Sequence, residues 1–241
     1  MNAPQILKQS DTVVELFRYL RNNVTLMKKK MIRDKLIKSY LESNEIKKLQ
    51  IGAGPTILSG WLSTDINPDH PKAVYLDATK VFPFEDNTFN YIFCEHMIEH
   101  VPYNSGLSML KECRRVLKPG GIMRITTPDL EVLIGLYLQN GNPLNERYIE
   151  WITDTFLSDI SVYKASFVIN NAFHAWGHKF LYDGDLLAMT MQKTGFTNIK
   201  RYSPGQSNDE NLKGIETHGK NANEDEMVRF ETMFFEGTVT L

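Results

Sequence analysis

Five short apolar segments follow one another between residues 48 and 126, with turn-forming residues between them. Segments of this length, bounded by glycine, proline and aspartate, are typical of buried β-strands. We expect these strands at 49–52, 61–66, 73–76, 91–94 and 122–126. A helical stretch at 107–117 precedes the last strand and ends at Lys-Pro-Gly-Gly, a strong stop signal. Buried strands joined by helices favour a largely parallel sheet with helices packed on its faces.

The first connection in this pattern is unusually short. Roughly six residues separate Gly54 from the second strand, whereas a parallel crossover normally needs a dozen or more. Pro55 and Gly60 bracket this connection. We therefore expect a vestigial turn where a first helix would otherwise stand.

The remainder of the chain is predicted to hold helices, one polar loop and two further strands. Helical spacing of apolar residues predicts helix in the first 45 or so residues, and the aromatic-rich segment 129–182 is also helix-like. The other elements are expected as a helix at 185–193, a strand at 197–202, a polar loop at 203–225 and a final strand at 231–240.

Charge and cysteine content exclude several classes of function. The 27 Lys and Arg residues against 29 Asp and Glu give a net charge of −2, which provides no global positive field for nucleic acid. No apolar stretch is long enough to span a membrane, and the N-terminus lacks a secretory signal pattern. Cys94 and Cys113 are too few for a disulfide scaffold or a cysteine-based zinc site, so we expect a reducing, cytoplasmic setting.

One segment departs from this overall balance of charge. Between Arg18 and Lys38 there are eight basic residues and a single acid, Asp34, so that 8 − 1 gives a local charge of +7. Such a segment is compatible with a solvated helix face. It is also compatible with a contact for an anionic substrate or with peripheral binding to an anionic membrane surface.

The first expected strand runs directly into Gly52-Ala53-Gly54. Glycine lets the backbone turn at positive φ and approach a ligand closely. The dinucleotide fingerprint G-x-G-x-x-G fails here, because Ile57 takes the third glycine position and the first acid at a strand end, Asp65, comes too early. A carboxylate at that strand end can accept both hydroxyls of a ribose, but it can equally be a turn aspartate.

Together with the segments that follow, these residues resemble class I S-adenosylmethionine (SAM)-dependent methyltransferases, and among them the broad methyltransferase type 11 group. The resemblance covers residues 49 to about 130. Its specific parts are Ile51-Gly-Ala-Gly54, Gly60-Trp-Leu-Ser-Thr-Asp65, Leu76-Asp77-Ala78, Phe84-Glu-Asp-Asn-Thr-Phe89, Ile98-Glu-His-Val101 and Leu117-Lys-Pro-Gly-Gly121. It implies a Rossmann-like α/β fold, with a mostly parallel sheet whose last strand is antiparallel and with helices on both faces. N-terminal helices and a helical insertion after the fifth strand are added to this core.

The resemblance also implies a cofactor, SAM, with S-adenosyl-L-homocysteine as product. Its glycine turn approaches the methionine part, Asp65 binds the ribose hydroxyls and Asp77 meets the adenine amino group. Glu95 and His96 match positions beside the methionyl moiety and the reacting methyl group. The implied cofactor-binding residues are Gly52, Ala53, Gly54, Asp65, Ile66, Asp77, Ala78, Glu95 and His96. The chain departs from the fuller family turn at Thr56, where a third glycine would stand.

We expect one methyltransferase domain over residues 1–241, made of four parts. They are an N-terminal helical cap at 1–45, a SAM-binding half at 46–130, a helical lid insertion at 131–182, and a C-terminal helix with strands at 183–241. The resemblance does not identify the acceptor, and the oligomeric state is left open.

Histidines in the segments outside the core suggest how an acceptor could be activated. An alcohol needs a base to take its proton, and histidine can do so at neutral pH. His178 is the first choice as base, with His96 and His218 as alternatives. These histidines therefore favour O-methylation. The family resemblance implies a small-molecule acceptor, such as a sugar or a related metabolite, and the basic N-terminal segment would fit an anionic one. A small amine as acceptor would need less help and is an alternative.

Three alternative hypotheses compete with this one. His174 and His178 stand four residues apart, and with Asp129 they could be considered as metal ligands, but no convincing metal cage is visible and no metal is expected. A SAM-binding partner protein without catalysis is a further alternative. A nucleic-acid methyltransferase is disfavoured by the net charge, and by Cys94-Glu-His-Met97 in place of an Asn/Asp-Pro-Pro-Tyr/Phe motif.

Overall fold

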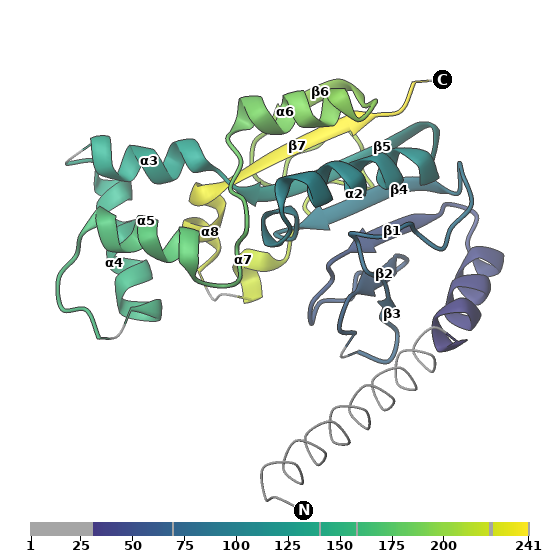
Figure 1. Ribbon diagram of the computed structural model, residues 1–241, viewed down its shortest axis with the longest axis horizontal. Helices are drawn as coiled ribbons and strands as arrows, with labels where there is room; N and C mark the ends of the chain where they lie inside the picture. Colours follow the sequence, from purple (N-terminus) through teal and green to yellow (C-terminus); the bar gives the residue numbers. More distant parts are fainter. Residues whose placement is uncertain (1–30, 69, 140, 158, 222–223, 241) are drawn as a thin grey trace, which may run out of the picture. The chain divides into compact units, whose positions relative to one another are not determined.

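A seven-stranded sheet dominates the larger of two units of the chain (Figure 1). The structure is a computed structural model that describes residues 31–68, 70–139, 141–157, 159–221 and 224–240. It divides into residues 1–45 and residues 46–241. The second unit contains the sheet and all elements of the candidate site.

The strand order of the sheet is β3-β2-β1-β4-β5-β7-β6. Its strands are β1 (Lys48–Ile51), β2 (Leu62–Asp65), β3 (Val74–Tyr75), β4 (Phe89–Glu95), β5 (Leu117–Pro128), β6 (Thr197–Tyr202) and β7 (Thr232–Thr238). The pairs among β1 to β5 are parallel, and β7 is antiparallel to both β5 and β6. The mostly parallel sheet with an antiparallel last strand, expected from the sequence, is therefore confirmed.

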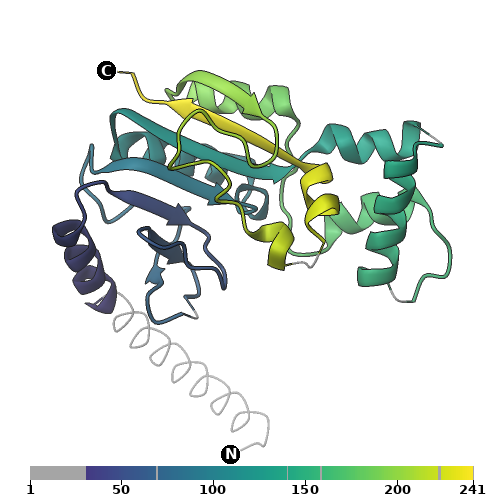
Figure 2. The same cartoon turned by 180° about the vertical axis from the view of Figure 1, so that it is seen from behind.

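The sheet is covered on both faces. Ile92 and Phe93 are neighbours on β4, so their side chains point to opposite faces, and both are fully buried. On one side lie the helices α2 (Tyr103–Val116) and α6 (Gly184–Lys193), as Figure 1 shows. On the other side, seen in Figure 2, the segment that follows β6 crosses the strands, and its Leu212 packs with Trp61 and Phe93. Apolar burial on both faces explains why these strands have near-continuous apolar sequences.

The register of the parallel strands brings their carboxyl ends to one edge. Ile51 of β1 pairs with Thr64 of β2 and with Cys94 of β4. Residues that follow these strands therefore lie close together. Residues 52–61 contain turns and no helix, which confirms the vestigial first connection, and residues 76–88 hold no helix either.

The insertion after β5 consists of α3 (Leu130–Leu138), α4 (Pro143–Phe156) and α5 (Ala165–His174). The Asp129 and Asn142 side chains accept hydrogen bonds from backbone N–H groups of the first turns of α3 and α4, which is how such residues favour a helix start. Leu133, Tyr148 and Val168 form the centre of a separate apolar cluster between these helices. The helical insertion expected from the sequence is thus present, and its helices pack around an apolar cluster of their own.

Two local expectations need correction. Lys118 to Gly121 were expected to separate the helix from the fifth strand, but β5 begins already at Leu117 and includes them. The loop expected at 203–225 also contains the short helix α7 (His218–Asn221), and α8 (Asp225–Glu231) replaces the start of the final strand. The apolar side of α8 packs into the insertion cluster through Met227, a long-range contact without a signal in the local sequence.

The N-terminal unit is described only in its last part, where residues 31–43 are helical. The basic segment predicted from Arg18 to Lys38 therefore lies largely outside the described residues. Within the helix, Lys35 and Lys38 are exposed and Arg33 pairs with Asp34 at 2.7 Å. In the part of the chain that the structure describes, no helix has the length and apolar character required to cross a bilayer.

A buried arginine ties the crossing segment to the sheet, and its removal should destabilise the fold. Arg124 of β5 is fully buried and pairs with Glu216 and, at 2.6 Å, with Glu236 of β7. Arg124→Ala leaves two poorly solvated carboxylates without a partner, so we expect a loss of about 3–5 kcal/mol in the free energy of unfolding. Arg147→Ala breaks an exposed ion pair with Glu226 and should change it little. Urea denaturation measures both, and equal effects would contradict the assignment of Arg124.

Candidate active site

The turn after β1 requires glycine at its first position. Gly52 has φ +68°, and a Cβ placed on it would lie 2.5 Å from Cγ of Met97, which is too close for any side chain. Gly54 also has a positive φ, of +53°, but has open space around it. The turn therefore brings bare backbone to the carboxyl edge of the sheet, as a ligand that lies close to the chain requires.

Two aspartates stand beside this turn. Asp65, at the end of β2, accepts hydrogen bonds from the backbone N–H of Gly54 at 3.0 Å and of Asn67 at 2.7 Å. Asp77, just after β3, accepts from the backbone N–H and the hydroxyl of Thr79. A carboxylate has about four lone-pair sites, so each of these groups retains acceptor capacity for a ligand. The hydrogen bonds fix the two carboxylates in place.

The glycine turn and both aspartates line one cavity of about 370 Å³. Of the cofactor-binding residues predicted from the sequence, it brings together Gly52, Gly54, Asp65, Ile66, Asp77, Ala78 and His96. Its volume is within the range of ordinary small-molecule sites. Bare backbone and two fixed carboxylates in one cavity suit a ligand with a nucleoside and an amino-acid part, so these residues fit SAM.

Ala53 and Glu95 do not line this cavity. The buried Ala53 donates its backbone N–H to Thr64. The Glu95 carboxylate accepts from the N–H and hydroxyl of Thr217, both at 2.9 Å, and from the N–H of His218. Glu95 thus holds the segment that carries His218, and its predicted place beside the methionyl moiety finds no support in this geometry.

A second cavity of about 360 Å³ adjoins the first. Its walls come from the insertion, from α8 and from the end of β4. Its lining residues are His96, Glu99, His100, Pro128, Trp151, Ile152, Phe156, Trp176, His178, His218, Val228 and Glu231. His96 and His100 line both cavities, so these two side chains form a wall between a cofactor-sized space and a space with aromatic walls.

All three histidines predicted as catalytic candidates reach the second cavity. His96 has φ +43°, an uncommon conformation for a residue with a side chain. Its Nε2 lies 2.9 Å from the hydroxyl of Thr232 and its Nδ1 lies 3.4 Å from Oε1 of Glu99. The ring stacks on that of His218, with centroids 4.1 Å apart. The contacts of His96 with Thr232 and His218 bring together residues that lie more than 120 positions apart.

The environment gives the three imidazoles different pKa values. Burial alone would lower the pKa of His96, but the Glu99 carboxylate more than compensates, and the pKa is raised. Burial lowers the pKa of His178, partly offset by the Ala172 carbonyl. His218 as a residue is exposed, yet desolvation of its ring and the neighbouring His96 lower its pKa to about 4. His96 is thus the imidazole that most readily carries a charge, and His178 and His218 favour the neutral form.

His178 is also oriented by a hydrogen bond. Its Nδ1 lies 2.7 Å from the carbonyl oxygen of Ala172, the residue near the end of α5. A carbonyl only accepts, so Nδ1 carries the proton in the neutral ring and Nε2 keeps a free lone pair. His178 therefore has both the protonation state and the free nitrogen that a proton acceptor needs.

Sequence reasoning missed several residues of this site. Glu99 is fully buried, and Glu231 is buried with the Tyr148 hydroxyl donating to it. The Ile98-Glu99-His100 segment was visible as part of the motif, but nothing in it indicated that the carboxylate faces a cavity. Conversely, His174 is exposed at the end of α5, and Asp129 pairs with Arg201 at 2.5 Å. These two residues do not join His178 in a cluster.

Comparisons with known proteins match the central part of the chain. Residues 49–125, about a third of the chain, match the family model of a methyltransferase domain. Demethylmenaquinone methyltransferase of Staphylococcus aureus is 39% identical over 72 residues, which cover 29% of this chain and 29% of that protein. The chain is therefore matched over less than a third of this relative. The predicted resemblance to SAM-dependent methyltransferases is confirmed for this segment, and with it SAM as the cofactor of the matched domain.

Solved methyltransferases resemble the chain over most of its length, but weakly. A SAM-dependent methyltransferase from Archaeoglobus fulgidus has a TM-score of 0.46 and 14% identity, and the match covers 87% of this chain and 94% of that one. A methyltransferase of Haloferax volcanii, solved in complex with the Trm112 activator, has a TM-score of 0.44 and 14% identity, with 89% and 94% covered. Likenesses at this level leave the acceptor and any partner of this chain open.

The two aspartates of the first cavity should decide the affinity for SAM. We expect Asp65→Ala to weaken SAM binding about ten-fold or more, because loss of charge-assisted hydrogen bonds to the ribose costs roughly 1.5–3 kcal/mol. Asp77→Ala should weaken it less. Glu210→Ala, which removes an exposed carboxylate outside the cavity, serves as control. Isothermal titration calorimetry measures all three, and unchanged affinity in Asp65→Ala would refute the ribose assignment.

Proposed function

We propose that the chain is a SAM-dependent methyltransferase that acts on a small-molecule acceptor. The observation that carries this proposal is the wall of His96 and His100 shared by the two cavities. A cofactor held by the glycine turn, Asp65 and Asp77 would have its methionine end near that wall. An acceptor in the aromatic cavity would then meet the methyl group from the other side.

Positioning is the main task that this chemistry leaves to the protein. SAM supplies a methyl group on a sulfonium, and the leaving group is a neutral thioether. The chain therefore needs to hold the acceptor atom in line with the carbon–sulfur bond and to exclude water. The aromatic walls from Trp151, Phe156 and Trp176 can do both, because they shape the cavity and are apolar.

The lining of the second cavity bears on the class of acceptor. It contains two carboxylates, Glu99 and Glu231, and no Lys or Arg among its described residues. This supports an uncharged or cationic acceptor with an apolar face, and gives no support to the anionic acceptor that the basic N-terminal segment suggested. We keep O-methylation of a sugar or related metabolite as the first proposal. N-methylation of a small amine is the second, favoured by the two buried carboxylates.

His178 is the proposed proton acceptor when the nucleophile is an alcohol. Its pKa is lowered, so the imidazole is neutral at pH 7, and its Nε2 lone pair is free. His96 suits this role less, because Glu99 favours its charged form. His218 also suits this role less. Glu95 accepts a hydrogen bond from its backbone N–H, and its ring stacks on that of His96. Its pKa is lowered to about 4, which makes it a weak base.

Replacing His178 should slow the reaction without affecting the cofactor. For His178→Ala we expect kcat to fall about 10²-fold or more, the usual effect of losing a general base, while SAM affinity stays near that of the wild type. The acid limb of the wild-type pH profile, expected below about pH 6.5 because the pKa of His178 is lowered, should be absent in the variant. His174→Ala, at an exposed histidine nearby, is the matched control. Full activity in His178→Ala would move the role to His96 or His218, or favour an amine acceptor.

Ligand-induced stabilisation tests the proposal before any acceptor is known. SAM or S-adenosylhomocysteine should raise the melting temperature, because a ligand that binds only the folded state stabilises it by mass action, and NAD should not. An acceptor screen with labelled SAM then distinguishes an enzyme from a silent SAM-binding partner. Stabilisation by NAD alone would overturn the proposal, and salt-dependent binding of RNA or DNA would favour a nucleic-acid substrate instead.

A further inference from the structure

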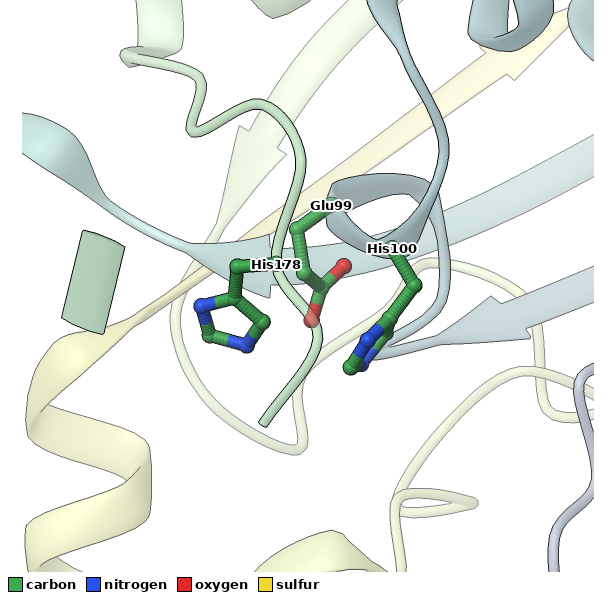
Figure 3. Close-up of side chains that lie close together, drawn as sticks. All are labelled: Glu99, His100 and His178. Atoms are coloured by element: carbon green, nitrogen blue, oxygen red, sulfur yellow. The ribbon is translucent and has the colours of Figure 1, made fainter. Parts of the chain in front are cut away.

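We propose that Glu99, His100 and His178 bind a divalent cation of the first transition series, such as Zn²⁺ or Mn²⁺. Figure 3 shows the Glu99 carboxylate between the two imidazoles, with Glu99 and His100 on the turn after β4 and His178 on the segment that follows α5. Each side chain offers a ligand atom, and the three atoms lie within 4.8 Å of one another. His100 borders both cavities, so the ion would sit where they meet.

The spacing of the three atoms is close to that of a metal site. Ligands about 2.1 Å from a tetrahedral ion lie about 3.4 Å from one another. The three ligand atoms already lie within 4.8 Å of one another, so each pair would have to approach by at most about 1.4 Å to reach that separation. The site therefore needs only a small adjustment of side chains to close around an ion.

His178 is already oriented as metal-binding histidines are. Such histidines donate the N–H of one ring nitrogen to a carbonyl or carboxylate, which fixes the tautomer and directs the other nitrogen at the ion. The hydrogen bond from Nδ1 to the Ala172 carbonyl does this here. Two consecutive residues with positive φ, Trp176 at 54° and Gly177 at 81°, turn the chain sharply before His178.

The backbone ties this histidine to the residue that provides the carboxylate. The N–H groups of Lys179 and Phe180 both donate to the carbonyl oxygen of Glu99, at 2.7 and 3.2 Å. The segment that carries His178 is thereby fixed to the turn that carries Glu99 and His100. A site built on hydrogen-bonded backbone keeps its ligands in place whether or not an ion is bound.

A second, independent observation is that one buried oxygen of the Glu99 carboxylate makes no hydrogen bond in the part of the chain that the structure describes. Its side chain is fully buried, and Oε2 accepts a hydrogen bond from the Thr127 hydroxyl at 3.0 Å. Oε1 has no hydrogen-bond partner within the described residues, although Nδ1 of His96 lies 3.4 Å away. A buried carboxylate oxygen without a full partner is costly. A cation between Glu99 and the two other ligands would supply that partner.

The ligand set indicates the kind of ion. Two imidazoles and one carboxylate suit Zn²⁺, Mn²⁺ or Fe²⁺ better than Mg²⁺ or Ca²⁺, which prefer oxygen ligands. Three protein ligands also leave a coordination position open, as in catalytic rather than structural sites. The sequence offers no third ligand at a suggestive spacing from His174 and His178, and so predicts no metal, whereas this cluster takes its other ligands from the turn after β4.

The role of the ion, unlike its binding, rests on the proposed function. At the open position an acceptor hydroxyl would be held beside the shared wall and its pKa lowered. With an ion bound, His178 would hold the ion and the proton of the acceptor hydroxyl would leave to water, whereas in the metal-free protein His178 is the proton acceptor proposed above. The effect of His178→Ala on kcat keeps its direction, because the same nitrogen is lost.

Direct metal binding tests the site independently of methyl transfer. Protein freed of metal with a chelator is titrated with Zn²⁺ and with Mn²⁺ by calorimetry, and Mn²⁺ binding is also followed by electron paramagnetic resonance. We expect one ion per chain, and an affinity at least about ten-fold lower in His178→Ala and Glu99→Gln. His174→Ala should bind as the wild type does. His178 is only partly buried, so its variant should fold even if substitution of the buried Glu99 does not allow folding.

Two sets of outcomes separate this inference from the proposed function. No binding at millimolar ion, or equal binding by the wild type and His178→Ala, would overturn the cation site, and methyl transfer by metal-free protein would then leave the proposed function intact. If the ion binds as expected but SAM binds neither the metal-free nor the metal-loaded protein, the site stands and the proposed function fails.

Discussion

The hydrogen bonds from Lys179 and Phe180 to the carbonyl of Glu99 join the helical insertion to the sheet. A second link lies at the end of β5, where Leu130 donates its N–H to the carbonyl of Tyr182. The insertion thus leaves and re-enters the core at two adjacent points, so α3, α4 and α5 are anchored at the carboxyl edge of the sheet. Trp151 and Trp176 of this anchored part of the chain line the aromatic cavity together with Glu99 and His100 of the turn after β4.

Buried charges at this edge are arranged in pairs that compensate one another. Burial alone would raise the pKa of Glu99, but the neighbouring His96 lowers it, and Glu99 in turn raises that of His96. Glu231 behaves differently, because burial raises its pKa even though the Tyr148 hydroxyl donates to it. The aromatic cavity is therefore lined by an ion pair of Glu99 with His96 and by a carboxyl group, Glu231, whose pKa is raised.

Local sequence was sufficient to predict that the glycine turn and Asp65 lie together at one cavity. Gly52 and Asp65 directly follow strands, and parallel pairing alone brings such positions to one edge. The acceptor side could not be predicted in this way, because Trp151 and Val228 reach the cavity from helices almost 80 positions apart in the chain. Glu95 shows the same limit, since its position after β4 suggested a ligand contact while its partner, Thr217, stands in a polar segment 122 residues away. The helix α8 was missed because its apolar side is defined only by the insertion it packs on.

The central claim is that the cofactor and acceptor cavities meet at His96 and His100. A crystal structure of the chain with bound S-adenosylhomocysteine tests this most directly. We predict the ribose at Asp65, the adenine beside Asp77, and the sulfur directed at the wall of His96 and His100. A ligand whose sulfur points away from that wall, or one that occupies the space between Trp151 and Trp176 instead, would contradict it.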